Sequence, residues 1–252
     1  MLSSFADGRL FGERTGEGRP WVLALHGWGR SKGDFHQVLA PTRPGAEEPA
    51  PLAAIALDLP GFGASPVPGQ AWGSARYATE VAAVLDEMDE RVVLLGHSFG
   101  GRVAVHLAAA RPDKVAGLVL SGVPLYRVGP RRRSPFAYRA IRAAHRAGML
   151  GEERLERARR RYGSADYRAA TGVLRDVLVR VVGEEYEAVL KEIACPVELV
   201  WGANDTTAPV AAARRAVDVL ERAHLVVLEG VGHLTPTEAP SELRAATMRL
   251  RP

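Results

Sequence analysis

A serine lies at the centre of a glycine-rich segment, Gly96-His-Ser-Phe-Gly-Gly101. The residues before it, 91–95, are rich in valine and leucine and are typical of a buried strand, whereas residues 102–110 have the composition of a helix. A strand, a tight turn and a helix form the setting in which Gly-x-Ser-x-Gly exposes its serine on a strained backbone. The pattern predicts that Ser98 is a nucleophile, and a plain glycine-rich turn is the alternative.

An acid and a base follow later in the chain, each directly after a predicted strand. Asp205 follows the strand expected at 196–201, and His233 follows the strand expected at 225–228. A serine hydroxyl is a weak nucleophile at neutral pH, so a histidine must accept its proton and a carboxylate must orient the imidazole. Asp205 and His233 are therefore candidates for these two roles. Capping of the next helix is the alternative for Asp205.

Strands alternate with helices along most of the chain. The remaining strands are expected at 9–15, 21–25, 53–57 and 115–120, and the main helices at 74–90, 209–221 and 237–250. This alternation predicts an α/β fold, with a mostly parallel sheet flanked by helices on both faces. Ligands of such sheets bind at the carboxyl ends of the strands, which is where the candidate residues lie.

The alternation stops at residue 123 and resumes near residue 193. Between these points, arginine-rich helical segments replace the strands. We therefore expect a core formed by residues 1–122 and 193–252, and an inserted helical cap formed by residues 123–192. The cap is expected to lie over the carboxyl edge of the sheet.

The chain resembles the α/β-hydrolase superfamily over essentially its whole length. The resemblance rests on five segments in the family's order: His26-Gly-Trp-Gly29, Asp58-Leu-Pro-Gly-Phe-Gly-Ala-Ser65, Gly96-His-Ser-Phe-Gly100, Gly202-Ala-Asn-Asp205 and Gly232-His233. It implies a catalytic triad of Ser98, Asp205 and His233, and an oxyanion hole formed by the backbone amides of Trp28 and Phe99. It also implies that Asp58 shapes the site without reacting.

The resemblance further implies a serine hydrolase that cleaves an ester, thioester or related acyl bond of a small molecule through an acyl-enzyme. Superfamily members that resemble it in fold but act as dehalogenases or epoxide hydrolases carry an aspartate in place of Ser98. Two alternatives stay open. One is a hydrolase of carbon–carbon bonds in diketone-type substrates, which also uses a serine. The other is a non-catalytic ligand receptor on the same fold.

The positive charge of the chain is concentrated in the expected cap. Residues 125–193 hold 16 Lys or Arg against 9 Asp or Glu, although the net charge of the whole chain is only +4. A solvated surface is one interpretation. Attraction of an acidic substrate or an acidic carrier protein is the other, and His26-Gly-Trp-Gly29 also resembles a segment of carrier-protein methyl ester esterases of the biotin pathway. Candidate substrate-binding residues are His26, Arg131, Arg132 and Arg133. For His26, which flanks a glycine turn, a role as hydrogen-bonding scaffold is the alternative.

Other classes of function have little support. The modest charge does not suggest nucleic acid, no histidine or cysteine spacing suggests a metal, and the glycines at 61 and 63 lack the context for a dinucleotide cofactor. The single cysteine excludes an intrachain disulfide, the N-terminal residues do not resemble a signal peptide, and no run of 18 apolar residues occurs. We expect a cytoplasmic protein with no cofactor, no metal and no membrane partner.

Overall fold

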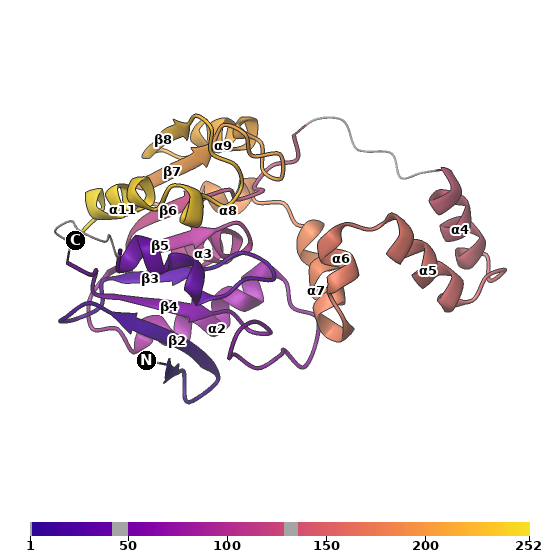
Figure 1. The fold of residues 1–252 in the computed structure, drawn as a ribbon, viewed down its shortest axis with the longest axis horizontal. Helices are drawn as coiled ribbons and strands as arrows, with labels where there is room; N and C mark the ends of the chain where they lie inside the picture. Colours follow the sequence, from indigo (N-terminus) through magenta and orange to yellow (C-terminus); the bar gives the residue numbers. More distant parts are fainter. Residues whose placement is uncertain (1, 42–49, 129–135) are drawn as a thin grey trace.

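An eight-stranded sheet forms the centre of the computed structural model, which describes residues 2–41, 50–128 and 136–252 (Figure 1). In chain order the strands are β1 (Leu2–Phe5), β2 (Leu10–Thr15), β3 (Val22–Leu25), β4 (Ala54–Asp58), β5 (Val92–His97), β6 (Val115–Ser121), β7 (Val197–Gly202) and β8 (Ala223–Leu228). Across the sheet the order is β1-β2-β4-β3-β5-β6-β7-β8. Only the pairs that include β2 are antiparallel, so the predicted mostly parallel sheet is confirmed.

Helices cover both faces of this sheet. One face packs against α2 (Ser74–Asp86), α3 (Phe99–Ala110) and α9 (Val210–Val217). The other face packs against η1 (Lys32–Phe35), α1 (His36–Leu39) and α11 (Pro240–Arg249), with α10 (Thr235–Glu238) directly before α11. Each layer buries an apolar face of the sheet, as an α/β fold requires.

The central strands are buried on both sides, as is typical of parallel sheets. All four residues of β3 are fully buried. Successive side chains point to opposite faces, so Leu94 of β5 packs in the layer with α2 and α3, whereas Val93 packs with α1 and α11. The loops at the carboxyl ends of these strands therefore start from tightly packed anchors.

The segment between β6 and β7 is helical wherever the structure describes it. Its helices are α4 (Phe136–Arg146), α5 (Glu152–Tyr162), α6 (Ala165–Ala169), α7 (Gly172–Val182) and α8 (Glu187–Leu190). Figure 1 shows α6 and α7 beside the core, whereas α4 and α5 project away from it. The helix α7 reaches the loop after β4, because a Cβ atom placed on Gly61 would lie 2.5 Å from Cδ2 of Leu174.

The expected cover over the carboxyl edge is thus seen for α7 but not for α4 and α5. The physical reason is that α4 buries none of its residues, so no apolar contact holds it on the core. The division of the chain into a core (1–122 and 193–252) and a cap (123–192) remains our proposal.

Partly buried polar contacts join both ends of the insertion to the core. The guanidinium of Arg102, on α3, donates to the carbonyl of Pro124 at 3.2 Å and to the carbonyl of Val181 at 2.5 Å. The carboxylate of Glu184 accepts from the amide and the hydroxyl of Ser74, at 2.9 and 2.6 Å. The base of the insertion is therefore fixed to the helix that begins at the candidate nucleophile.

The described helices are too short or too polar to cross a membrane. Within the same residues, no group of three or more His, Cys, Asp or Glu side chains is placed to hold a metal ion. The expectations of a cytoplasmic location and of no membrane, cofactor or metal stay predictions.

Candidate active site

The turn between β5 and α3 presents Ser98. Its backbone has φ 49° and ψ −113°, a conformation that non-glycine residues rarely adopt and that costs about 1–3 kcal/mol. The turn also lies close to its neighbours. A Cβ atom on Gly100 would lie 2.0 Å from the carbonyl oxygen of Leu25, and one on Gly96 would lie 2.6 Å from Cα of Gly101. Glycine at both positions is therefore needed for this strained turn to form.

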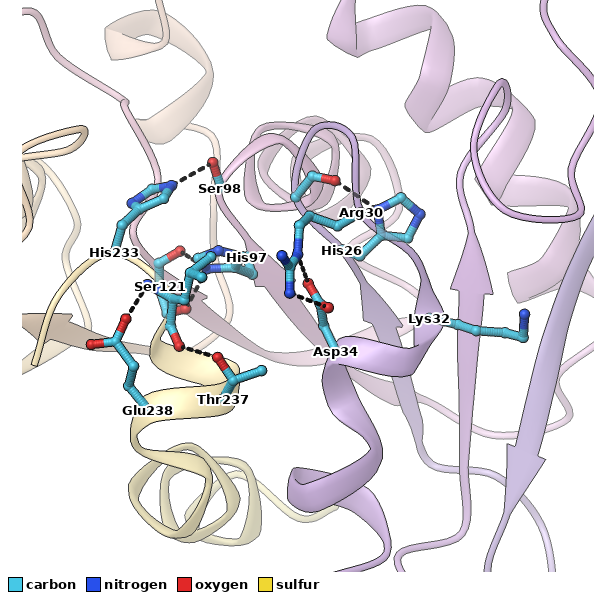
Figure 2. A network of polar contacts seen from close by, with 12 residues as sticks. His26, Arg30, Lys32, Asp34, His97, Ser98, Ser121, His233, Thr237 and Glu238 are labelled. Atoms are coloured by element: carbon cyan, nitrogen blue, oxygen red, sulfur yellow. Dashed lines mark hydrogen bonds and ion pairs between the residues drawn. The ribbon is translucent and has the colours of Figure 1, made fainter. Parts of the chain in front are cut away.

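A chain of hydrogen bonds joins the three candidate residues, and Figure 2 shows its contact between His233 and Ser98. Nε2 of His233 lies 3.1 Å from Oγ of Ser98, and Nδ1 of His233 lies 2.8 Å from Oδ2 of Asp205. A carboxylate only accepts, so Nδ1 carries the hydrogen and the lone pair of Nε2 faces the serine. Asp205 is only 4% exposed, and its second oxygen accepts from the amides of Thr207 and Ala208, both at 2.8 Å. The acid is thus held rigidly.

The loops that carry Asp205 and His233 pack backbone against backbone. They follow the neighbouring parallel strands β7 and β8. The amide of Asn204 donates to the carbonyl of Val231 at 2.9 Å. A Cβ atom on Gly202 would lie 2.2 Å from the carbonyl oxygen of Gly232. This close approach explains why the sequence places a glycine at position 202, where the loop of Asp205 begins.

The loop after β3 lies against the turn that carries Ser98. A Cβ atom on Gly27 would lie 3.4 Å from Cβ of Ser98. The rings of Trp28 and Phe99 meet edge to face with centroids 5.4 Å apart. In the described part of the chain, the backbone amides of these two aromatic residues donate no hydrogen bond. Two amide donors next to the serine therefore stay available for a ligand oxygen.

A sequence comparison fits this geometry. Residues 22–246 match the profile of the alpha/beta hydrolase family. The chain belongs to this family. The predicted superfamily and fold are therefore confirmed.

Relatives of this α/β hydrolase have several activities. It is 30% identical to a pimeloyl-(acyl-carrier protein) methyl ester esterase of Aromatoleum aromaticum over 243 residues, which cover 85% of this chain and 91% of the relative. It is 28% identical to a 2-hydroxy-6-oxononadienedioate/2-hydroxy-6-oxononatrienedioate hydrolase of Cupriavidus pinatubonensis over 252 residues, which cover 89% and 84%. A thermophilic esterase from Thermogutta terrifontis superposes over 100% of both chains with a TM-score of 0.68 at 22% identity, which shows the fold alone.

A second histidine, His97, packs against the ring of His233, the candidate base. The ring of His97 is buried and its centroid lies 5.1 Å from that of His233. Its Nδ1 lies 3.1 Å from the carbonyl oxygen and 3.0 Å from the hydroxyl oxygen of Ser121, so Ser121 holds the ring in place. Burial, and then the neighbouring His233, lower the pKa of His97 to about 3, so the ring is neutral at ordinary pH.

Sequence reasoning missed Gly122, which borders both histidines. Its φ is +58°, and a Cβ atom there would lie 3.0 Å from Nδ1 of His233 and 3.2 Å from Cε1 of His97. A glycine two residues after the predicted strand 115–120 was the available signal, because the carboxyl ends of all parallel strands meet at this edge.

The structure corrects the interpretation of His26 as a substrate-binding residue. Its side chain is fully buried. Nδ1 lies 2.7 Å from the carbonyl oxygen of Gly27, and Nε2 accepts from the amide of Leu59 at 3.0 Å. Burial lowers the pKa of His26, which keeps the ring neutral. Both nitrogens serve the backbone, so His26 is part of the scaffold of the loop after β3.

Asp58 is also part of the scaffold. Its buried carboxylate accepts from Nζ of Lys32 at 2.8 Å, from the Lys32 amide at 2.9 Å and from the Ala64 amide at 3.0 Å. Burial alone would raise the pKa of Asp58, but these hydrogen bonds outweigh it and the pKa is lowered. Asp58 thus joins the loop after β3 to the loop after β4.

The predicted substrate-binding arginines Arg131, Arg132 and Arg133 lie outside the described residues, and their role stays a prediction. Other arginines of the insertion are described. Six of those on α4 and α5 are exposed and form no ion pair with any carboxylate in the described residues: Arg139, Arg142, Arg146, Arg154, Arg157 and Arg161.

Proposed function

We propose that this α/β hydrolase cleaves a carboxylic ester through an acyl-enzyme formed on Ser98. The observation that carries the proposal is the continuous hydrogen-bond chain from Ser98 through His233 to the buried Asp205. In this arrangement His233 can take the proton of the serine hydroxyl at neutral pH. A serine without a neighbouring base, or with a histidine that no carboxylate orients, is a weaker nucleophile.

In the first half of the reaction, Oγ of Ser98 attacks the ester carbonyl while its proton moves to Nε2 of His233. The positive charge on the ring is stabilised by the carboxylate of Asp205. The carbonyl oxygen becomes an oxyanion, which the amides of Trp28 and Phe99 bind. The amide of Phe99 also begins α3, where the helix dipole favours negative charge. Each such donor contributes about 3–4 kcal/mol to the transition state.

In the second half, the ester bond breaks and the leaving alcohol takes the proton from His233. A water molecule then attacks the acyl carbonyl of the acyl-enzyme and gives its proton to Nε2. The carboxylic acid leaves, and the hydroxyl of Ser98 is restored. The rate should therefore fall at acidic pH, because a protonated His233 cannot accept a proton from Ser98.

The acyl group is proposed to arrive on an acidic carrier protein. Relatives from Aromatoleum aromaticum and Chromobacterium violaceum, 30% and 31% identical, are named for an ester on an acyl-carrier protein. The six arginines of α4 and α5 that have no ion pair in the described residues supply a basic surface, which complements the acidic charge of such a carrier. Of this substrate, only the small acyl group must reach Ser98.

Cleavage of a carbon–carbon bond beside a ketone is the second candidate. It is supported by the 28% identical relative named for an oxo-dienedioate substrate. A panel of short-chain and long-chain acyl esters, run against diketone-type compounds under equal conditions, separates the two. Turnover of the diketones alone would favour the second candidate.

The direct test is Ser98→Ala. We expect kcat on a p-nitrophenyl ester to fall by about three to six orders of magnitude with the fold intact. Wild-type protein should also react with a fluorophosphonate probe, and the variant should not. A variant that keeps more than about a tenth of the activity would contradict the serine mechanism. A wild-type protein inert to the probe would instead favour a ligand receptor.

A further inference from the structure

The backbone around His233 lies in an irregular loop between β8 and α10. Residues 231–234 of this loop are only half-buried. The loop must nevertheless place Nε2 of His233 within hydrogen-bond distance of Ser98, and this distance is 3.1 Å. Apolar packing is too sparse here to fix the backbone, so the loop needs polar contacts to hold its shape.

One carboxylate supplies such contacts on both sides of His233. Oε2 of Glu238 accepts from the amide of Gly232 at 2.5 Å, and Oε1 accepts from the amide of Leu234 at 3.1 Å. Both oxygens of a single side chain thus hold the residue before and the residue after His233. Figure 2 shows Glu238 on the side of His233 that is away from Ser98, so it does not compete for the reacting atoms.

The lack of a side chain at Gly232 makes room for this contact. A Cβ atom on Gly232 would lie 3.1 Å from Oε2 and 3.3 Å from Oε1 of Glu238, closer than side-chain contacts usually are. On its other side the loop is held by the Asn204 amide, which donates to the carbonyl of Val231 at 2.9 Å. The base is therefore fixed between the loop of Asp205 and the helix α10.

We propose that Glu238 is a positioning residue that sets the place of His233 for proton transfer. This inference rests on the proposed function, since it requires His233 to be the base. A displacement of about 1 Å in a catalytic group can cost about 100-fold in rate. The hydrogen bonds of Glu238 within the described residues go to backbone amides alone, so its removal acts on turnover and not on substrate affinity.

The test compares Glu238→Ala and Glu238→Gln with Glu229→Ala as a matched control. Glu229 is an exposed carboxylate of the same loop, and the structure shows no hydrogen bond or ion pair for it among the described residues. Each variant is titrated to completion with a fluorophosphonate probe. The end point counts competent sites, and the initial rate reports how well His233 activates Ser98.

We expect kcat per titrated site on a p-nitrophenyl ester to fall about 10- to 100-fold in Glu238→Ala, with KM within about twofold of wild type. The rate of reaction with the probe should fall in step. Glu238→Gln keeps one acceptor oxygen, so its kcat per titrated site should lie between the values of Glu238→Ala and wild type. Glu229→Ala should have the wild-type kcat per titrated site. A merely structural residue would change the number of titrated sites but not kcat per site.

An unchanged kcat per site in Glu238→Ala, or an equal loss in Glu229→Ala, would overturn the inference and leave the proposed function standing. Where Glu238→Ala fails to fold, Glu238→Gln decides by the same ratio. Failure of the proposed function is recognised separately, by a wild-type protein that does not react with the probe or by an active Ser98→Ala variant.

Discussion

The edge of the sheet that carries Ser98 and the arm formed by α4 and α5 are held in opposite ways. At the edge, groups are buried and fixed by the backbone, as for Asp205, whose carboxylate accepts two backbone amides and His233. In the arm, α4 buries no residue, and α5 buries only Leu155 and Ala158 and forms ion pairs such as Glu156 with Arg175. The chemistry needs atoms placed to within tenths of an ångström, whereas a surface that attracts a charged partner needs only charge and reach.

The strongest test of the rigid edge is Asp205→Asn. The asparagine keeps the shape of the side chain but favours the wrong tautomer of His233, and in serine hydrolases this costs about 10⁴-fold in kcat. We expect a loss of that size on a p-nitrophenyl ester, with the thermal midpoint lowered by only a few degrees. The measurement is kcat together with a melting curve. A loss below about tenfold would mean that Asp205 only caps the following turn.

The residues of this edge could be predicted because each signal is local. A run of valine and leucine ends at Gly96, and parallel strands bring all their carboxyl ends together, so Asp205 and His233 could be placed near Ser98 without any structure. The contact of Glu238 with the loop could not be predicted in this way. It depends on how the chain turns between β8 and α10, and charge pattern alone does not encode that turn.

Three elements differ from expectation for physical reasons. The strand β1 was missed because four residues with two central serines, Ser3 and Ser4, carry no strong strand signal until they pair with β2. The expected helix at 237–250 is two helices, α10 and α11, because Pro240 forces Ala239 out of the helical region to φ −142° and ψ 57°. The insertion was expected to lie over the carboxyl edge of the sheet, and this was wrong for α4. A helix with few buried contacts is not placed by the hydrophobic pattern of the sequence.

A second prediction compares a buried ion pair of the core with an exposed one of the arm. Lys32→Met leaves the fully buried Asp58 carboxylate without its cation, and we expect the free energy of unfolding to fall by about 3 kcal/mol at pH 7. Arg159→Met removes an ion pair with Glu152, whose side chain is 63% exposed, and should cost less than about 1 kcal/mol. Urea unfolding of both variants measures the difference.

The pH dependence sharpens this comparison. Because the pKa of Asp58 is lowered in the folded protein, its ionised form contributes stability above the pKa of an unfolded aspartate, about 3.9, and this contribution is lost as pH falls through the folded pKa. The deficit of Lys32→Met should therefore be full at pH 7 and shrink below about pH 4. A deficit that stays constant down to pH 3 would assign it to lost packing of the lysine stem.

The smallest effect is expected in the arm itself. Reversing Arg139, Arg142 and Arg146 to Glu should lower kcat/KM for an ester on an acidic carrier protein about 5- to 50-fold at low salt, because attraction between opposite charges is replaced by repulsion between like charges. The triple variant should hydrolyse a neutral p-nitrophenyl ester at the wild-type rate. The control variant Arg214→Glu, a charge reversal on α9 in the core, should keep the wild-type kcat/KM for both substrates.

The salt dependence tests the same attraction in the wild-type protein. Its rate with the acidic substrate should fall as salt rises, since the screening length shortens from about 10 Å at 0.1 M to about 3 Å at 1 M. Equal salt dependence for both substrates, or an unchanged ratio in the triple variant, would leave the arginines as a solvated surface. The arm would then differ from the edge that carries Ser98 in rigidity but have no part in choosing the substrate.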